Sequence, residues 1–243
     1  ASYVDTIYQS TNSLLAIIND ILDYSRIESG RLELDPVAVD PEALLDQCLM
    51  LFAVQSRQKK LPLIASVAPE VPGQVRLDPV RVKQIINNII GNAFKFTERG
   101  SIQVRISCEA ESPARCRLVI CVEDTGIGIA QENLALVFEP FTQTEEVTTG
   151  FYGGTGLGLT ICKQIADLLG GQLRVESRQN EGTTFSFVFP AVQLTGDSKP
   201  EKPQINYTAL RGKKILVVED NPINRQVAEL FLKKANMQVA SAS

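Results

Sequence analysis

The chain has 243 residues, a formal net charge of −4 and an isoelectric point near 5.1, with acidic and basic residues interspersed. This charge balance excludes the basic surface of a nucleic-acid-binding protein. No apolar run approaches the roughly 20 residues of a membrane span, and no signal peptide opens the chain, so we expect a water-soluble piece. The five cysteines form no metal-type pairs and are expected to be reduced core residues, and histidine is absent.

Residues 1–30 carry an apolar stripe in alternating steps of three and four, which predicts a helix of a bundle. The helix is expected to end near Ser29 and Gly30. A lone apolar stripe would not stay exposed, so we expect its packing partner to lie upstream or on another chain. The stripe comprises Val4, Ile7, Thr11, Leu14, Ile18, Ile21 and Ser25, widened by Tyr8, Leu15 and Leu22.

The next segment mixes predicted strands and helices. Helices are expected from Asp40 to Lys60, from Asp78 to Lys95 and from Gly156 to Gly170, the first two with proline at the first helical position. Strands are expected at 32–34, 63–67, 74–77, 101–108, 117–123, 172–177 and 183–189, the last four as two hairpins. The pattern predicts an α+β fold, a two-layer α/β sandwich whose mixed sheet is covered on one face by helices.

The composition changes after this segment. Residues 195–206, with glycine, serine and two Lys-Pro steps, are typical of a linker. Beyond them we expect a strand at 214–218, a helix at 223–235 and the start of a strand at 237–240. This tail is too short to bury a core alone, so it is expected to be the beginning of a truncated domain.

Two polar motifs stand within the mixed segment. Asn88, Asn92 and Lys95 share one helix face, where an amide oxygen can ligate Mg²⁺ and a lysine can reach a phosphate. A solvated helix face is the alternative. Asp124 follows a strand and precedes Gly126 and Gly128. Its carboxylate can accept a hydrogen bond from the exocyclic amine of a base, while the flat ring of the base lies against the glycine backbone. An ordinary Asp-x-Gly turn is the alternative here.

Two further motifs follow. Phe138 and Phe141 precede the polar stretch 142–152, which is long enough for a mobile lid. The glycines of the run Gly153 to Gly158 fit neither the P-loop nor the dinucleotide template. Glycines admit an anion to backbone N–H groups, and a helix N-terminus adds roughly half a positive charge. The alternative is an ordinary glycine-rich loop.

In order and spacing, these motifs resemble the ATP-binding domain of histidine kinases: residues 88–97 the N box, 124–129 the G1 box, 138–141 the F box and 153–159 the G2 box. The resemblance implies ATP and Mg²⁺ as cofactors. By it, Asp124 holds the adenine amino group and Asn92 ligates Mg²⁺. Lys95 contacts the phosphates, with Asn88 as a nearby polar partner, and these two are the catalytic candidates. The further expected nucleotide contacts are Gly126, Gly128, Phe138, Gly154, Thr155, Gly156, Leu157 and Gly158.

The flanks extend the resemblance to a hybrid sensor histidine kinase. Residues 1–30 resemble the second helix of the dimerisation and phosphotransfer domain, and residues 31–192 form the ATP-binding domain. A linker at 193–211 leads to the start of a receiver domain at 212–243, with Glu219 and Asp220 as its Mg²⁺-binding pair. The resemblance implies a cytoplasmic kinase module of a membrane-anchored sensor. By the same resemblance, such a module is expected to pair with a second copy or with another histidine kinase and to transfer the γ-phosphoryl group of MgATP to a histidine.

Two departures limit what the resemblance implies. The helix that carries the phosphoacceptor histidine is missing, so the chain is expected not to autophosphorylate and to need an acceptor helix outside it. The receiver also stops before its phosphoacceptor aspartate. Hybrid kinases often place a cation before the G2 glycines, but no basic residue occurs from Glu139 to Ile161. A catalytically weak regulatory module is therefore the alternative, whereas an ATP-hydrolysing chaperone or repair protein is disfavoured by both flanks.

Overall fold

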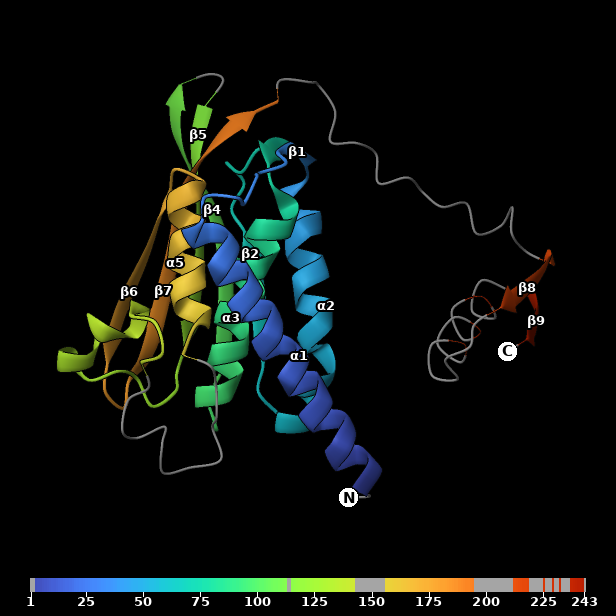
Figure 1. Cartoon of the computed structure of the whole chain (residues 1–243). Coiled ribbons are helices and arrows are strands. Elements are labelled where there is room, and N and C mark those ends of the chain that lie inside the picture. Colours follow the sequence, from blue (N-terminus) through green and yellow to red (C-terminus); the bar gives the residue numbers. More distant parts are fainter. Residues whose placement is uncertain are drawn as a thin grey trace. The chain divides into compact units, whose positions relative to one another are not determined.

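The computed structural model describes residues 3–112, 115–142, 156–194, 212–218, 225, 229, 232 and 237–242, without the side chains of residues 3–6, 8–10, 12, 13 and 16. The chain divides into two compact units, Ala1–Asp197 and Ser198–Ser243. Figure 1 shows their helices and strands, and each unit is described by itself.

A seven-stranded mixed sheet forms the base of the first unit. Its strand order is β1-β3-β7-β5-β4-β2, and β6 also pairs with β7. The β2–β4 pair is parallel and the other pairs are antiparallel, so β4–β5 and β6–β7 are the two predicted hairpins. The strands are β1 (Val37–Val39), β2 (Leu63–Val67), β3 (Val75–Leu77), β4 (Ile102–Ser112), β5 (Arg115–Asp124), β6 (Gln172–Arg178) and β7 (Gly182–Gln193).

Helices cover one face of this sheet (Figure 1). They are α1 (Tyr3–Glu28), α2 (Pro41–Lys59), α3 (Pro79–Phe96) and α5 (Gly158–Leu168). Alternate strand residues, such as Val104 and Phe187, are buried beneath them, as the period of two along a strand requires. The two-layer α/β sandwich is thereby confirmed. None of the described helices is long and apolar enough to cross a bilayer.

One predicted strand is misplaced. Residues 32–34 are not in a strand, and β1 lies five residues further along, where Val37 pairs with Leu77 of β3. The backbone N–H of Asp35 donates to Asp78 Oδ2 at 2.9 Å, which fixes the chain beside the start of α3. The residues after Pro36 are therefore the ones that meet β3.

The two ends of α1 have different surroundings. Tyr24 and Ile27, near its C-terminus, pack against the core of the first unit. The expectation that the helix has no partner within the chain is therefore wrong for this end. Its apolar stripe is nevertheless open, since Ile7, Leu14 and Ile18 are 65%, 57% and 43% exposed.

The described part of the second unit is a parallel pair of strands, β8 (Lys214–Val218) and β9 (Gln238–Ala242). Both strands agree with the sequence prediction. The predicted linker at 195–206 lies outside the described residues, as does most of the predicted helix at 223–235.

Asp78 and Asp40 cap α3 and α2 in the same way, which provides a matched pair of substitutions. Asp78 Oδ1 accepts from the N–H groups of Val80 and Arg81, and Asp40 Oδ1 from those of Glu42 and Ala43. Asp78 is also buried and holds Asp35.

We expect Asp40→Ala to lower the free energy of unfolding by about 0.5–2 kcal/mol, as the loss of a helix N-cap does. Asp78→Ala should cost about 1 kcal/mol more, because it also removes the part-buried hydrogen bond from the Asp35 N–H. Urea unfolding followed by circular dichroism measures both. Equal losses for the two variants would contradict the proposed tether to Asp35.

Candidate nucleotide-binding site

The polar face of α3 meets the first turn of α5. Asn92 Nδ2 donates to Asn88 Oδ1 at 3.2 Å. A Cβ on Gly158 would lie 2.5 Å from Asn88 Nδ2, so a larger residue where α5 begins would push the Asn88 side chain aside. The structure therefore brings Asn88 and Asn92 together with the positive end of the α5 helix dipole.

This arrangement suits a hard cation that is also bound by anionic oxygens. Because Asn92 uses its amide nitrogen toward Asn88, its carbonyl oxygen points another way and can serve as a ligand. Among the described residues no cluster of three or more His, Cys, Asp or Glu could hold a metal ion. A neutral amide oxygen supplemented by phosphate oxygens is the kind of ligand set that Mg²⁺ accepts.

Lys95 is the cation nearest to this face along α3. Its Nζ lies 4.8 Å from the centre of the Phe96 ring. Burial lowers the pKa of the Lys95 ammonium below its ordinary value, because desolvation disfavours the charged form. A partly desolvated ammonium attracts a phosphate more strongly than one in bulk water.

Asp124 is the buried acid of the site, at the end of β5. Its Oδ1 accepts from the backbone N–H of Gly126 at 2.8 Å and from Thr97 Oγ1 at 3.5 Å. Burial raises the pKa of the Asp124 carboxyl, and hydrogen bonds from Gly126, Thr183 and Thr97 oppose the shift. These donors orient a carboxylate that can accept a further hydrogen bond from a ligand.

The two glycines after Asp124 leave no room for side chains. A Cβ on Gly126 would lie 2.5 Å from the carbonyl oxygen of Phe96. Gly128 has a φ of +68° and a Cβ there would collide with the carbonyl group of Arg178. The loop that contains these two glycines therefore lies against the backbone at the end of α3 on one side and against the backbone of the β6–β7 turn on the other.

Phe138 is fixed from two elements. Its ring packs edge-on against Phe185 of β7, with centroids 6.5 Å apart and planes at 82°. Lys163 of α5 places its Nζ 5.6 Å from the Phe138 ring centre, a cation–π distance. The short helix Leu136–Phe138 is therefore anchored to both the sheet and α5.

Phe141 and Gly156 are joined by a backbone hydrogen bond. The Phe141 N–H donates to the Gly156 carbonyl at 3.1 Å. Gly156 has a φ of +70°, and a Cβ there would meet the Phe141 backbone at 2.9 Å. The two ends of the segment 142–155 are therefore held together. Leu157, the next residue, is buried in the core.

Four of the expected site residues lie outside the described part of the chain: Gly154, Thr155, Glu219 and Asp220. The others gather around the ends of α3, α5 and β5.

Thr183 and Ser177 are site residues that the sequence analysis missed. Thr183 is buried opposite Asp124 in the β5–β7 register, and Ser177 Oγ accepts from the Ile129 N–H at 2.8 Å. The signal was a polar residue at an inward-facing position of a predicted strand.

The chain is similar in sequence and in fold to histidine kinases. The model of the histidine kinase-, DNA gyrase B- and HSP90-like ATPase family matches residues 77–193. The signal transduction histidine-protein kinase BarA of Shigella flexneri is 36% identical over 98% of this chain, which spans 26% of BarA. The hybrid signal transduction histidine kinase L of Dictyostelium discoideum is 40% identical over 76% of this chain and 11% of its own length.

A solved structure agrees in fold. The crystal structure of full-length ShkA in complex with AMPPNP matches with a TM-score of 0.68 and 29% identity, over 99% of this chain and 48% of that one. The match includes the sheet and the helices that hold the Asn88 and Asp124 sites. Residues 77–193 therefore belong to the histidine kinase-, DNA gyrase B- and HSP90-like ATPase family, and the chain is homologous over nearly its whole length to hybrid sensor histidine kinases.

Proposed function

We propose that this chain binds MgATP and transfers the γ-phosphoryl group to a histidine on a helix that the sequence does not contain. The observation that carries the proposal is the buried, hydrogen-bonded Asp124 beside a loop that only glycine can form. The bound AMPPNP of ShkA, an ATP analogue, supports ATP as the ligand.

In this proposal Asp124 selects the base. Its carboxylate accepts a hydrogen bond from the exocyclic amine of adenine, while the ring lies against Gly126 and Gly128. Burial excludes water from this contact and so strengthens it. A guanine would present a carbonyl oxygen at the same place, which repels the carboxylate and donates no hydrogen bond to it.

The polar face of α3 holds the phosphate end. Asn92 supplies an amide oxygen to Mg²⁺, and Asn88 holds the Asn92 amide in position through their hydrogen bond. Lys95 neutralises charge on the phosphate oxygens, and the N–H groups at the start of α5 do the same. Bound Mg²⁺ would supply positive charge at the phosphates, and the work left to the protein is positioning and charge stabilisation.

The acceptor is expected beside α1. Its open apolar stripe fits another helix of a dimerisation bundle, from a second copy of this chain or from another histidine kinase.

We further propose the domain limits 1–30, 31–192, 193–211 and 212–243, with Glu219 and Asp220 as the metal-binding pair of a receiver domain. A membrane-anchored sensor with this module on its cytoplasmic side fits that domain order.

A regulatory module with weak or no catalysis is the second candidate. The observation in its favour is the absence of Lys and Arg from Glu139 to Ile161, where three glutamates make an unfavourable field for a polyanion. Such a module would use α1 to pair with an active kinase.

The first prediction tests the base pocket. Asp124→Asn should weaken ATP binding roughly ten- to a hundredfold and GTP binding less, because a charge-assisted hydrogen bond of about 1.5–3 kcal/mol is lost. Titration calorimetry gives the affinities. Glu123→Gln is the control, since Glu123 is an exposed acid next in sequence. If the ATP-to-GTP ratio is the same before and after Asp124→Asn, the base assignment is wrong.

The second prediction tests the metal ligand. Asn92→Ala should abolish the Mg²⁺ dependence of nucleotide binding and leave the fold intact, because helices accept alanine readily. Calorimetry with and without Mg²⁺ measures the effect. Asn87→Ala, on the same helix, should keep the dependence. A magnesium effect that survives in Asn92→Ala would exclude Asn92 as the ligand.

The third prediction separates a kinase from a regulator. If the missing cation limits catalysis, Gly150→Arg should raise the rate of transfer to a supplied histidine-bearing dimerisation domain up to about ten- to a hundredfold. Gly150→Gln, similar in length but uncharged, should not. A typical kinase rate in the wild-type chain without a gain from arginine contradicts the regulator. No transfer by any form, with ATP binding intact, contradicts the kinase.

A further inference from the structure

Helix α2 has one face that packs on the unit and one that is open. It is the outermost helix of the layer (Figure 1) and packs against α3 and β2. Its inward face carries Leu45, Cys48 and Phe52, which belong to the core or pack against it. The opposite face carries five exposed residues, which we name the Met50 stripe: Asp46, Met50, Ala53, Val54 and Arg57.

Helical periodicity sets the Met50 stripe opposite the core. At about 100° per residue, every member of the stripe lies within about 60° of Met50 around the helix. The buried Cys48 lies about 160° away from Met50. The side chains of the stripe therefore cannot turn into the core unless the whole helix rotates.

The middle of the Met50 stripe is apolar. Met50 and Val54 are 73% and 63% exposed, and Leu51, at the margin of the stripe, is 68% exposed. Single exposed apolar residues are ordinary, but three large ones within about one helical turn are typical of an interaction surface. Methionine adapts its shape readily to a partner. This face of α2 is therefore suited to packing against another helix.

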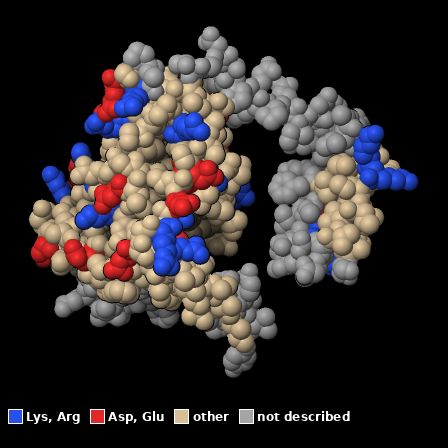
Figure 2. All heavy atoms as spheres, turned by 45° about the horizontal axis from the view of Figure 1, so that its top comes forward, with Lys and Arg blue, Asp and Glu red and all other residues tan. Residues whose placement is uncertain are grey.

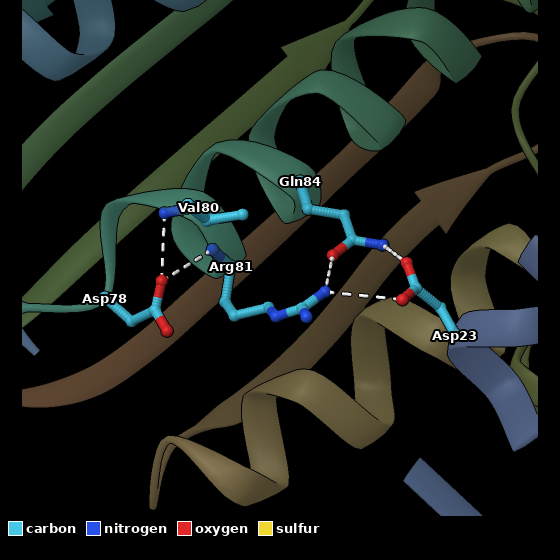
Figure 3. Close-up of polar contacts among 5 residues, drawn as sticks. All are labelled: Asp23, Asp78, Val80, Arg81 and Gln84. Carbon is cyan, nitrogen blue, oxygen red and sulfur yellow. Dashed lines mark hydrogen bonds and ion pairs between the residues drawn. The ribbon is translucent and has the colours of Figure 1, made fainter. Parts of the chain in front are cut away.

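The two ends of the Met50 stripe carry opposite charges. Among the residues that the structure describes, neither Asp46 nor Arg57 takes part in an ion pair. By contrast, the polar groups between α1 and α3 are paired with each other: Arg81 Nη1 lies 3.6 Å from Asp23 Oδ1 and donates to Gln84 Oε1 (Figure 3). The charges at the ends of the stripe are therefore available to a partner.

The order of these charges makes the stripe complementary to itself. Asp46 and Arg57 are 11 residues apart, so two copies of α2 packed antiparallel about the midpoint set each aspartate level with the arginine of the other copy. The same pairing sets Met50 level with Ala53 of the second copy, so that a long side chain meets a small one. A parallel pairing would place like charges side by side, which is unfavourable.

The wider surface does not oppose such a pairing. On the face drawn in Figure 2, basic and acidic side chains are interspersed over the described residues. The net charge of the whole chain is only −4. Two copies can therefore approach without strong repulsion, and no field of one sign indicates a highly charged partner instead.

We propose that the Met50 stripe is an interface between two copies of this chain, packed antiparallel about a two-fold axis level with Leu51. This interface is separate from the apolar stripe of α1, so the two together would join pairs of copies into larger assemblies. A contact between two single helices is smaller than a standard interface. It is therefore expected to be weak alone and to act mainly between copies that α1 already holds together.

Charge reversal tests the pairing by sedimentation over a series of protein concentrations. All forms carry Ile18→Glu, which puts a charge into the open stripe of α1 and prevents association through that helix. Asp46→Arg and Arg57→Asp should each weaken the dimer about tenfold or more, because two attractive pairs become repulsive. An equimolar mixture of the two variants should regain the dimer, since every charged contact between the two different chains is again attractive. Glu181→Arg, the same charge change at an exposed residue outside α2, should have no effect.

Truncation of an apolar side chain tests the middle of the stripe. Met50→Ser should also weaken the dimer about tenfold or more, because the lost contact occurs twice in a two-fold interface. Val192→Ser, at another exposed apolar residue, should not, and circular dichroism checks the folding of every form.

Two results overturn the proposal. A mixture of the charge variants that stays monomeric, while the chain with Ile18→Glu alone dimerises, excludes the antiparallel pairing. Absence of a dimer of the chain with Ile18→Glu alone at every concentration excludes the interface itself. None of these measurements uses a nucleotide, so their outcome is independent of whether the chain transfers phosphate.

Discussion

Helix α3 must serve the core and the candidate site at once, and the rest of the first unit depends on that double role. Seven of its side chains are buried: Val82, Ile85, Ile86, Ile89, Ile90, Ala93 and Phe94. Their burial, at about 1.5–3 kcal/mol for each large side chain, fixes the rotation of the helix about its axis. With that rotation fixed, Asn88, Asn92 and Lys95 cannot turn into the core. The hydrophobic effect thus sets the direction of the polar groups that make up the site.

The second determinant is the unfavourable burial of Asp124, which three hydrogen-bond donors offset. The donors come from three places in the chain: Thr97 after α3, Gly126 after β5 and Thr183 on β7. Each element end is therefore tied to the same carboxylate. A buried acid whose pKa is raised by desolvation is costly to maintain in its charged form. A ligand that donates a hydrogen bond to the Asp124 carboxylate would offset part of this cost.

The sequence predicted the parts of the fold that depend on local pattern. Alternating residues such as Phe185 and Phe187 gave the strands, and Asp78 before proline gave the start of α3 almost to the residue. The prediction failed for β1, because contacts between residues far apart in the sequence determine where this strand lies. Its position depends on the pairing with Leu77 and on the hydrogen bond from the Asp35 N–H to Asp78. The docking of α1 was missed for the same reason. The apolar stripe predicts only the face of α1 that is open to another helix, whereas Tyr24 and Ile27, which dock α1 on the core, lie outside that stripe.

The backbone bond between Phe141 and Gly156 has a consequence for how this part of the molecule can vary. Because the ends of the intervening segment are fixed to each other and to the core through Phe138 and Leu157, its length is nearly independent of the rest of the fold. Doubling the length of a flexible loop costs only about 0.6 kcal/mol in closure entropy. Related chains can therefore exchange this segment for longer, shorter or differently charged ones without disturbing Asn88 or Asp124. The charge and length of this segment can thus diverge while the surroundings of Asp124 stay the same.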